Sequence, residues 1–191
     1  TDPVSIFYML DKWIIPGERM LVLYINVNGD VQLVLNKLFP QTEDLGVPLT
    51  YYDDIEEPVG ILAKFIEKDK TIGIDKNWPA RFLLKLQDLG AGSKFVNGSV
   101  IVDKVRQIKD EHERQIMRES AKMIDEVMDK LIPWVAKGLT ERELNAKCVE
   151  LCKEVGFQGL SFDPITAYGK GGADPHHVTD DSKGKIGRAH V

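Results

Sequence analysis

Cysteine is scarce in this sequence of 191 residues, and its only two copies, Cys148 and Cys152, stand four residues apart. On a helix that spacing places both side chains on one face, and it does not match the C-x-x-C spacing of redox motifs or zinc half-sites. Because no other thiol is present, the sequence excludes a disulfide framework and favours a reducing, cytoplasmic compartment. We therefore expect both cysteines to be small core residues.

Long apolar runs and an excess of basic residues are also absent. The longest apolar stretches, residues 20–25 and 31–35, are far shorter than the ~20 residues of a membrane-spanning helix, so no membrane segment is expected. The 25 Lys and Arg are dispersed among 30 Asp and Glu, and this acidic balance disfavours a nucleic-acid partner. No signal peptide opens the chain at Thr1, unless processing has removed one. With 43% hydrophobic residues the chain is expected to be globular.

Strand and helix signals alternate over the first hundred residues, which predicts a mixed α/β domain. The strongest signal is Asn28-Gly29 between two apolar runs, which predicts a hairpin whose turn positions both accept positive φ. The other expected elements are a short helix started by Asp2-Pro3, a strand over 49–52, a helix opened by Glu57-Pro58, a short buried strand over 71–74, and a helix capped by Asn77 and closed by Gly90.

Helical periodicity dominates the rest of the chain. A long amphipathic helix is predicted over 110–132 and is expected to break at Pro133. Its apolar stripe is Met117, Ala121, Ile124, Met128 and Leu131. A capping box at 140–143 starts a second helix, which carries both cysteines and ends at Gly156. Residues 162–168 then look extended, and residues 169–172 form a glycine-rich turn. The boundary between the two parts is expected within 102–109.

One region is chemically suggestive, because His176 and His177 follow the glycine-rich turn closely. The glycines match neither the Walker nor the dinucleotide-binding pattern, so a phosphate site is not expected. Adjacent side chains on an extended segment point to opposite faces, so the two imidazoles do not readily bind one metal together. Two interpretations stay open: one functional imidazole, or two structural histidines.

Other candidate groups have simpler interpretations. Asp180 and Asp181 precede a polar stretch and are read as a solvated loop rather than a catalytic pair of carboxylates. Ser161 has no nucleophile-elbow context, so a serine hydrolase lacks support. The three tryptophans are scattered, and packing in a core or at a domain interface accounts for them; they are Trp13, Trp78 and Trp134.

A resemblance to a known family emerges when four segments are read in order. They are Val105–Glu113 with Met117-Arg118, Gly138–Glu143, Ser161–Ile165, and Pro175–His177. Together they resemble the opening of the pita-bread metallopeptidase domain, and Xaa-Pro dipeptidases and aminopeptidases P look most similar. Residues 2–10 and 16–19 resemble the creatinase-type N-terminal domain of the same enzymes. Leu10-Asp11 departs from the family's usual Thr-Gly.

The resemblance implies an α/β fold class: a creatinase-like mixed-sheet domain over 1–104, then the first helices and strand of a pita-bread α+β domain over 105–191. It implies a hydrolase of Xaa-Pro bonds in dipeptides or at peptide N-termini, which uses two divalent metals (Mn, Co or Zn) held by two Asp, one His and two Glu. His176 matches the family's histidine that contacts substrate and relays protons. No role is transferred to His177.

The expected metal ligands are missing from this sequence. No glutamate follows Glu154, and the family's first metal-binding aspartate would fall just beyond Val191, after a tail, residues 187–191, that departs from the family's Gly-Asp-apolar pattern. We therefore expect a fragment that holds no metal and is inactive alone, while contributing the N-terminal domain and the contacts of a homodimer. The alternatives are a non-catalytic pita-bread relative that binds peptides or proteins, and a creatinase-like C–N hydrolase.

Overall fold

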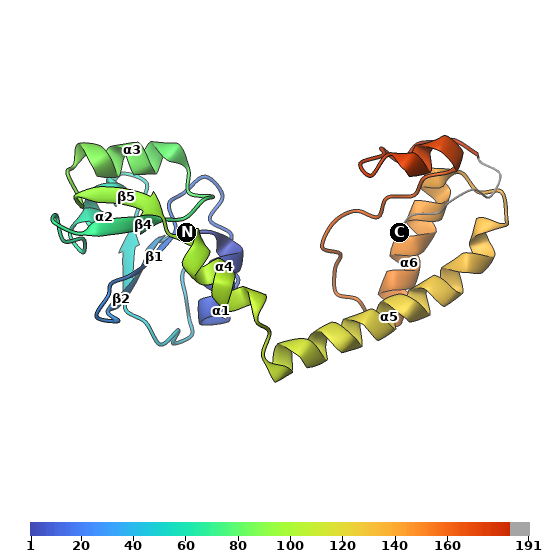
Figure 1. The fold of residues 1–191 in the computed structure, drawn as a ribbon, viewed down its shortest axis with the longest axis horizontal. Helices are drawn as coiled ribbons and strands as arrows, with labels where there is room; N and C mark the ends of the chain where they lie inside the picture. The colour runs from blue at the N-terminus through green and yellow to red at the C-terminus, as the bar shows by residue number, and fades with distance from the viewer. Residues whose placement is uncertain (184–191) are drawn as a thin grey trace. The chain divides into compact units, whose positions relative to one another are not determined.

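A computed structural model describes residues 1–183 and divides the chain into two units (Figure 1). The first unit comprises Thr1–Ile108, and the second begins at Lys109. The predicted sequence of a mixed α/β part followed by a helical part is confirmed.

The first unit contains two small sheets. Strands β1 (Val22–Ile25), β2 (Val31–Asn36) and β3 (Leu49–Tyr52) form a sheet in that order, with β1 antiparallel and β3 parallel to β2. Strands β4 (Thr71–Ile74) and β5 (Lys94–Asn97) form a parallel pair. The mixture of parallel and antiparallel pairing is the mixed-sheet architecture that the sequence predicts.

Four helices accompany these sheets: α1 (Pro3–Leu10), α2 (Pro58–Ala63), α3 (Ala80–Asp88) and α4 (Ser99–Gln107). The predicted starts of α1 and α2 are confirmed, because the side chains of Asp2 and Glu57 accept hydrogen bonds from first-turn amides. The predicted cap of α3 is wrong. Asn77 donates to Asp2 instead, and α3 begins after Pro79 without a side-chain cap.

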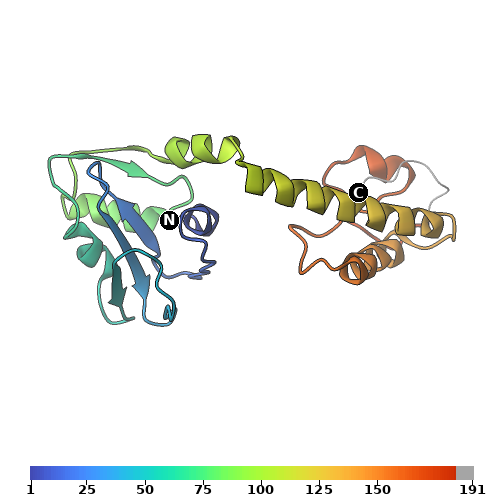
Figure 2. The same cartoon turned by 90° about the horizontal axis from the view of Figure 1, so that it is seen from below.

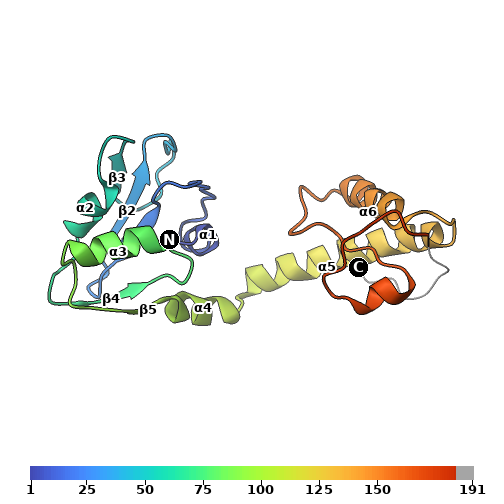
Figure 3. The same cartoon turned by 90° about the horizontal axis from the view of Figure 1, so that it is seen from above.

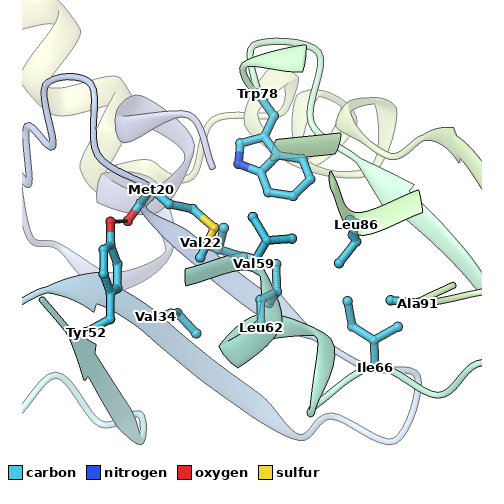
Figure 4. Packing of buried hydrophobic residues seen from close by; sticks show 10 residues of the cluster. All are labelled: Met20, Val22, Val34, Tyr52, Val59, Leu62, Ile66, Trp78, Leu86 and Ala91. Atoms are coloured by element: carbon cyan, nitrogen blue, oxygen red, sulfur yellow. Dashed lines mark hydrogen bonds between the residues drawn. The ribbon is translucent and has the colours of Figure 1, made fainter. Parts of the chain in front are cut away.

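The apolar core of the first unit lies on both faces of β2, because successive strand residues point to opposite sides. Leu33 and Leu35 belong to a cluster with Ile6 of α1. Val34 belongs to a second cluster with residues of α2, α3 and Trp78, shown in Figure 4. Helices therefore cover the three-stranded sheet on both faces, an arrangement that can be followed in Figure 2.

The predicted hairpin forms, but its turn differs from the prediction. The loop between β1 and β2 has five residues, and only Gly29 adopts positive φ, at 89°. The side chain of Asn26 accepts hydrogen bonds from the amides of Asn28 and Asp30, both at 2.9 Å. This side-chain closure makes the loop longer than a two-residue turn, so Asn28 needs no left-handed backbone. Similarly, β4 is not a buried strand, because Thr71 and Gly73 are exposed.

The second unit is built on two helices, α5 (Glu111–Val135) and α6 (Glu141–Val155), followed by a short 3-10 helix, η1 (Gly169–Ala173). Figure 3 shows α6 alongside α5. The predicted capping box at the start of α6 and its predicted end at Gly156, with φ 106°, are confirmed. A second capping box, between Asp110 and Glu113, begins α5 and was not predicted. The predicted break at Pro133 is wrong. Proline removes only one amide there, in the last turn, and α5 continues to Val135.

The predicted stripe of α5 is buried only toward the end of the helix. Leu131 is buried, whereas Met117 and Ile124 are about half exposed. The reason is length, since the 15 residues of α6 cannot cover the 25 of α5. Both cysteines are free and buried in this helix-pair core, which confirms their prediction as core residues.

Residues 163–168 run without helical structure, and they form no strand ladder within residues 1–183. Their amides bind side chains instead: Thr166 donates to Thr179, and Tyr168 donates to Glu141. Among the described helices, none combines the length and the apolar character needed to span a bilayer.

Candidate functional site

The candidate site lies where the first turn of α6 meets the segment 164–182. At its centre is Glu141, whose residue is only 1% exposed although it carries a carboxylate. A carboxylate is rarely buried unless it is paired and hydrogen-bonded. The neighbourhood of Glu141 is therefore expected to supply several donors.

Three donors reach Glu141 from two different stretches of the chain. Oε1 accepts a 2.7 Å hydrogen bond from the amide of Tyr168. Oε2 accepts from Nε2 of His177 at 2.7 Å and from the amide of Asp180 at 3.1 Å. Burial alone pushes the pKa of Glu141 upward, but these three hydrogen bonds outweigh it, so the pKa lies below its ordinary value and the group is ionised at neutral pH.

His177 is the ionic partner of this carboxylate. An ionised carboxylate only accepts hydrogen bonds, so Nε2 of His177 carries the proton. The hydrogen bond to Glu141 raises the pKa of His177 above its ordinary value, against the smaller opposing effect of desolvation. The negative charges of Asp180 and Asp174 also raise the pKa of His177. The arrangement is thus a charge-assisted pair that joins the loop to the start of α6.

His176 is exposed, and it lies in a turn rather than on the extended segment that the sequence predicts. Its amide donates to the side chain of Asp174 at 2.9 Å, and the amide of His177 donates to the backbone carbonyl of Asp174 at 3.2 Å. The structure therefore places one imidazole outward and the other against a buried carboxylate. An outward imidazole is free to meet a substrate, whereas the chemistry of His177 is committed to Glu141.

The remaining candidate groups lie apart from this centre or at its rim. Asp180 and Asp181 are both exposed, and Asp181 pairs with Arg142 at 3.0 Å. Ser161 is exposed in a loop. The tryptophans differ from one another: Trp78 is buried in the first unit, Trp134 packs against the helix-pair core, and Trp13 is 52% exposed.

Within residues 1–183, one group of three potential metal ligands is present: Glu141, His177 and Asp180. Their ligand atoms lie within 4.8 Å of one another. Nε2 of His177 carries a proton directed at Glu141, so this nitrogen has no lone pair with which to bind a metal ion between the two side chains. Both oxygens of Glu141 already accept hydrogen bonds. These residues do not fit the expected centre of two metals and five ligands. The tail 187–191, where the sequence departs from the family pattern, lies outside the described residues.

Glu141 was not predicted as a site residue, because in the sequence it stands inside the capping box of α6. Thr140 and Glu143 complete that box between them, at 2.8 and 3.1 Å, so capping does not require Glu141. A signal was available. Glu141 precedes Leu144 by three residues and Cys148 by seven, which places an acid on the apolar face of α6.

Comparisons with known proteins cover almost the whole chain. Residues 1–108 match the family model of the creatinase/prolidase N-terminal domain, and residues 115–190 match that of metallopeptidase family M24. An uncharacterised peptidase of Staphylococcus aureus is 25% identical over 188 residues, which is 96% of this chain and 52% of the relative. A Xaa-Pro dipeptidase of Pyrococcus horikoshii is 28% identical over 141 residues, 74% of this chain and 39% of the relative.

Solved structures give the same result. The chain matches the crystal structure of a dipeptidase from Pyrococcus horikoshii with a TM-score of 0.84 and 27% identity, over 97% of this chain and 52% of that one. It also shares the fold of a prolidase from Pyrococcus furiosus, with a TM-score of 0.78 and 21% identity over 96% of this chain and 56% of that one. The chain spans about half the length of the relatives and solved structures that it matches.

Proposed function

We propose a function from the premise that the chain belongs to the creatinase/prolidase N-terminal domain family and continues into a match to metallopeptidase family M24. The chain corresponds to the N-terminal half of a metallopeptidase that hydrolyses Xaa-Pro bonds in dipeptides or at peptide N-termini. The observation that carries this proposal is the order of the two matches, which together account for nearly the whole sequence. The resemblance to a Xaa-Pro dipeptidase over 74% of the chain supports the substrate class.

His176 is proposed as the substrate-contacting and proton-relaying imidazole of this half. Its exposure and the absence of a side-chain partner for its ring among the described contacts support that role. A positioned imidazole that moves protons contributes roughly 10²- to 10⁴-fold to a hydrolysis. This contribution alone is too small for efficient peptide cleavage, so the 191 residues by themselves are expected to be inactive.

The two metals belong, in this proposal, to residues that follow this half in the complete enzyme. Within residues 1–183, Glu141, His177 and Asp180 form the one group with ligand chemistry, and their mutual hydrogen bonds do not fit a bimetal centre. A bound metal pair would supply Lewis-acid activation of the scissile carbonyl and of water. The contribution of this chain is to bind and orient the peptide.

A homodimer formed through the first unit, and a cytoplasmic location, complete the proposal. Exposed apolar side chains on the first unit, such as Ile15 at 64% and Leu38 at 60%, are available for a subunit contact. Two free, buried thiols are compatible with a reducing compartment. Light scattering at micromolar concentration tests the dimer, and a monomer would count against it.

The function is tested with the protein extended to the full length of its relatives. The enzyme is expected to hydrolyse a Xaa-Pro dipeptide, to leave the corresponding Xaa-Ala dipeptide largely intact, and to lose activity on chelation. Full-length protein that holds no metal and cleaves neither dipeptide would support a peptide-binding relative instead. Turnover of creatine without metal would support a creatinase-like C–N hydrolase.

A further inference from the structure

Glu141 binds both arms of the loop that carries His176. The first arm reaches it through the amide of Tyr168, before the glycine-rich turn. The second arm reaches it through the ring of His177 and the amide of Asp180, after the turn. One buried carboxylate therefore closes the loop 168–180 at its base, and His176 lies within the closed part.

Further hydrogen bonds fasten the second arm to the start of α6. The amide of Glu141 donates to the carbonyl of Ser182 at 3.1 Å, and the amide of Arg142 donates to the carbonyl of Asp180 at 3.0 Å. These two amides belong to the first helical turn, whose N–H groups have no partner within the helix. The loop carbonyls thus accept hydrogen bonds from amides that have no partner within α6, and these hydrogen bonds hold the loop against the start of the helix.

The ring of His177 is also confined by Gly171 of η1. A Cβ added at Gly171 would lie 3.0 Å from Cε1 and 3.2 Å from Nδ1 of His177, tighter than ordinary van der Waals contact. The imidazole is therefore held between the backbone of η1 and the carboxylate of Glu141. Rotation of the ring away from Glu141 would break the charge-assisted bond and open the loop.

We propose that Glu141 and His177 are positioning residues, which hold the loop 168–180 so that the neighbouring His176 faces the substrate. The inference rests on the proposed function for the role of His176. It concerns residues that the family resemblance does not supply, since no role is transferred to His177 from it. Because reacting groups must be placed to within about 1 Å, loosening the loop is expected to reduce turnover by up to about a hundredfold.

The first arm of the test measures catalysis by the full-length protein. His177→Ala is expected to lower kcat for a Xaa-Pro dipeptide by about tenfold to a hundredfold with little change in KM. His177→Gln, whose side-chain amide can still donate to Glu141, is expected to recover most of the loss. The control is His112→Ala, since His112 is an exposed histidine of α5. Equal kcat for His177→Ala and His112→Ala would overturn the proposal.

The second arm measures the loop itself and does not depend on activity. In the 191-residue chain, Glu141→Gln is expected to speed amide hydrogen exchange in residues 164–182 by at least tenfold, with little change within α5 and α6. Glu150→Gln, the same substitution at an exposed position of α6, is expected to change neither. Exchange that rises equally throughout the second unit would overturn the positioning role, even if the full-length protein cleaves Xaa-Pro bonds. If Glu141→Gln speeds exchange as predicted but the full-length wild-type protein does not cleave Xaa-Pro bonds, only the proposed function is contradicted.

Discussion

The two units of this protein owe their order to different forces. In the first unit, a sheet is covered on both faces by helices, and residues such as Leu33 and Val34 are fully buried among apolar side chains. In the second unit, one helix pair has an apolar core that includes Tyr168, and the rest of the segment 164–182 is held by hydrogen bonds, three of which converge on Glu141. The Glu141–His177 pair should therefore make the order of residues 164–182 depend on pH, whereas the apolar side chains around β2 do not titrate.

The two units also differ in how deeply their ion pairs are buried. Most ion pairs of the first unit, such as Lys37 with Asp53, are exposed, and such pairs contribute little to stability. The exception is the amino group of Thr1 with Asp75, at 3.4 Å, which is mainly buried. The Glu141–His177 pair has one partner almost fully buried. Losing either member would leave donors or a charge without a partner in a region that water enters poorly, which is costly. The order of the loop that carries the candidate imidazole therefore depends in part on this one pair.

The largest expected effect on stability is in the first unit. Leu33→Ala removes a fully buried side chain and is expected to cost about 2–5 kcal/mol of unfolding free energy. Hydrogen exchange resolved by peptide should show the loss in α1 and β2, while residues 164–182 keep their rates. Val27→Ala, at a position 95% exposed, is the control. Equal acceleration of residues 164–182 would erase the distinction between the units.

Glu141→Ala is expected to have the next largest effect, confined to the second unit. The substitution leaves the amides of Tyr168 and Asp180 without their acceptor, at about 1–3 kcal/mol for each group that stays buried and unsatisfied. Urea unfolding followed by exchange should show the loss in residues 164–182 first. Glu150→Ala is the matched control on the same helix. A loss no larger than that of the control would mean that the loop is ordered by other contacts.

The order of residues 164–182 should depend on pH without any substitution. The pKa of Glu141 is lowered, so its contribution is present above its ordinary value of 4.5 and is lost as pH falls through the folded pKa. The pKa of His177 is raised, so its contribution is present below its ordinary value of 6.5 and is lost as pH rises through the folded pKa. Protection of residues 164–182 should therefore be greatest between pH 4.5 and 6.5.

This profile is measured by exchange at several pH values, corrected for the intrinsic rate. Glu141→Gln should flatten the profile in residues 164–182, because the pair no longer forms. An unchanged profile in that variant would assign the pH dependence to a group other than the pair, such as Asp180, whose charge also acts on His177.

The smallest expected effect comes from Gly171→Ala. The added methyl group would meet the His177 ring at 3.0 Å, so the ring must shift by a few tenths of an ångström from Glu141. A modest fall in the pKa of His177, followed by NMR titration of its ring, is expected. Gly159→Ala, where nothing lies within 4 Å of the added atom, should leave that pKa unchanged. Identical titrations in the two variants would show that Gly171 does not confine the ring.

Local signals in the sequence predicted much of the fold. Asp2, Glu57 and Thr140 each start a helix where expected, because a cap depends on residues only two or three positions away. The strand β5 and the helix α4 were not predicted, because β5 is short and α4 is rich in β-branched residues that favour strands. Pro133 was overestimated as a helix breaker, since the surrounding turn is held by its other hydrogen bonds.

The candidate site was predictable only in part. The glycine-rich turn and two adjacent histidines pointed to the right segment. The expectation of an extended segment with alternating side chains is wrong, because residues 175 and 176 form a turn closed on Asp174. The partner Glu141 was not found, because it lies 36 residues before His177 in sequence and 27 before Tyr168. Such pairings follow from how the loop returns to α6, which no local pattern encodes. An acid on an apolar helix face was the one usable sign.

The most direct test of the account is His176→Ala in the full-length protein, assayed for Xaa-Pro dipeptide turnover and for bound metal together. We predict a fall in kcat of about 10²- to 10⁴-fold with metal content unchanged, because in the proposed role this imidazole moves protons and contacts the substrate without binding an ion. Full turnover in the variant, or loss of its metal, would contradict the role given to this half of the enzyme.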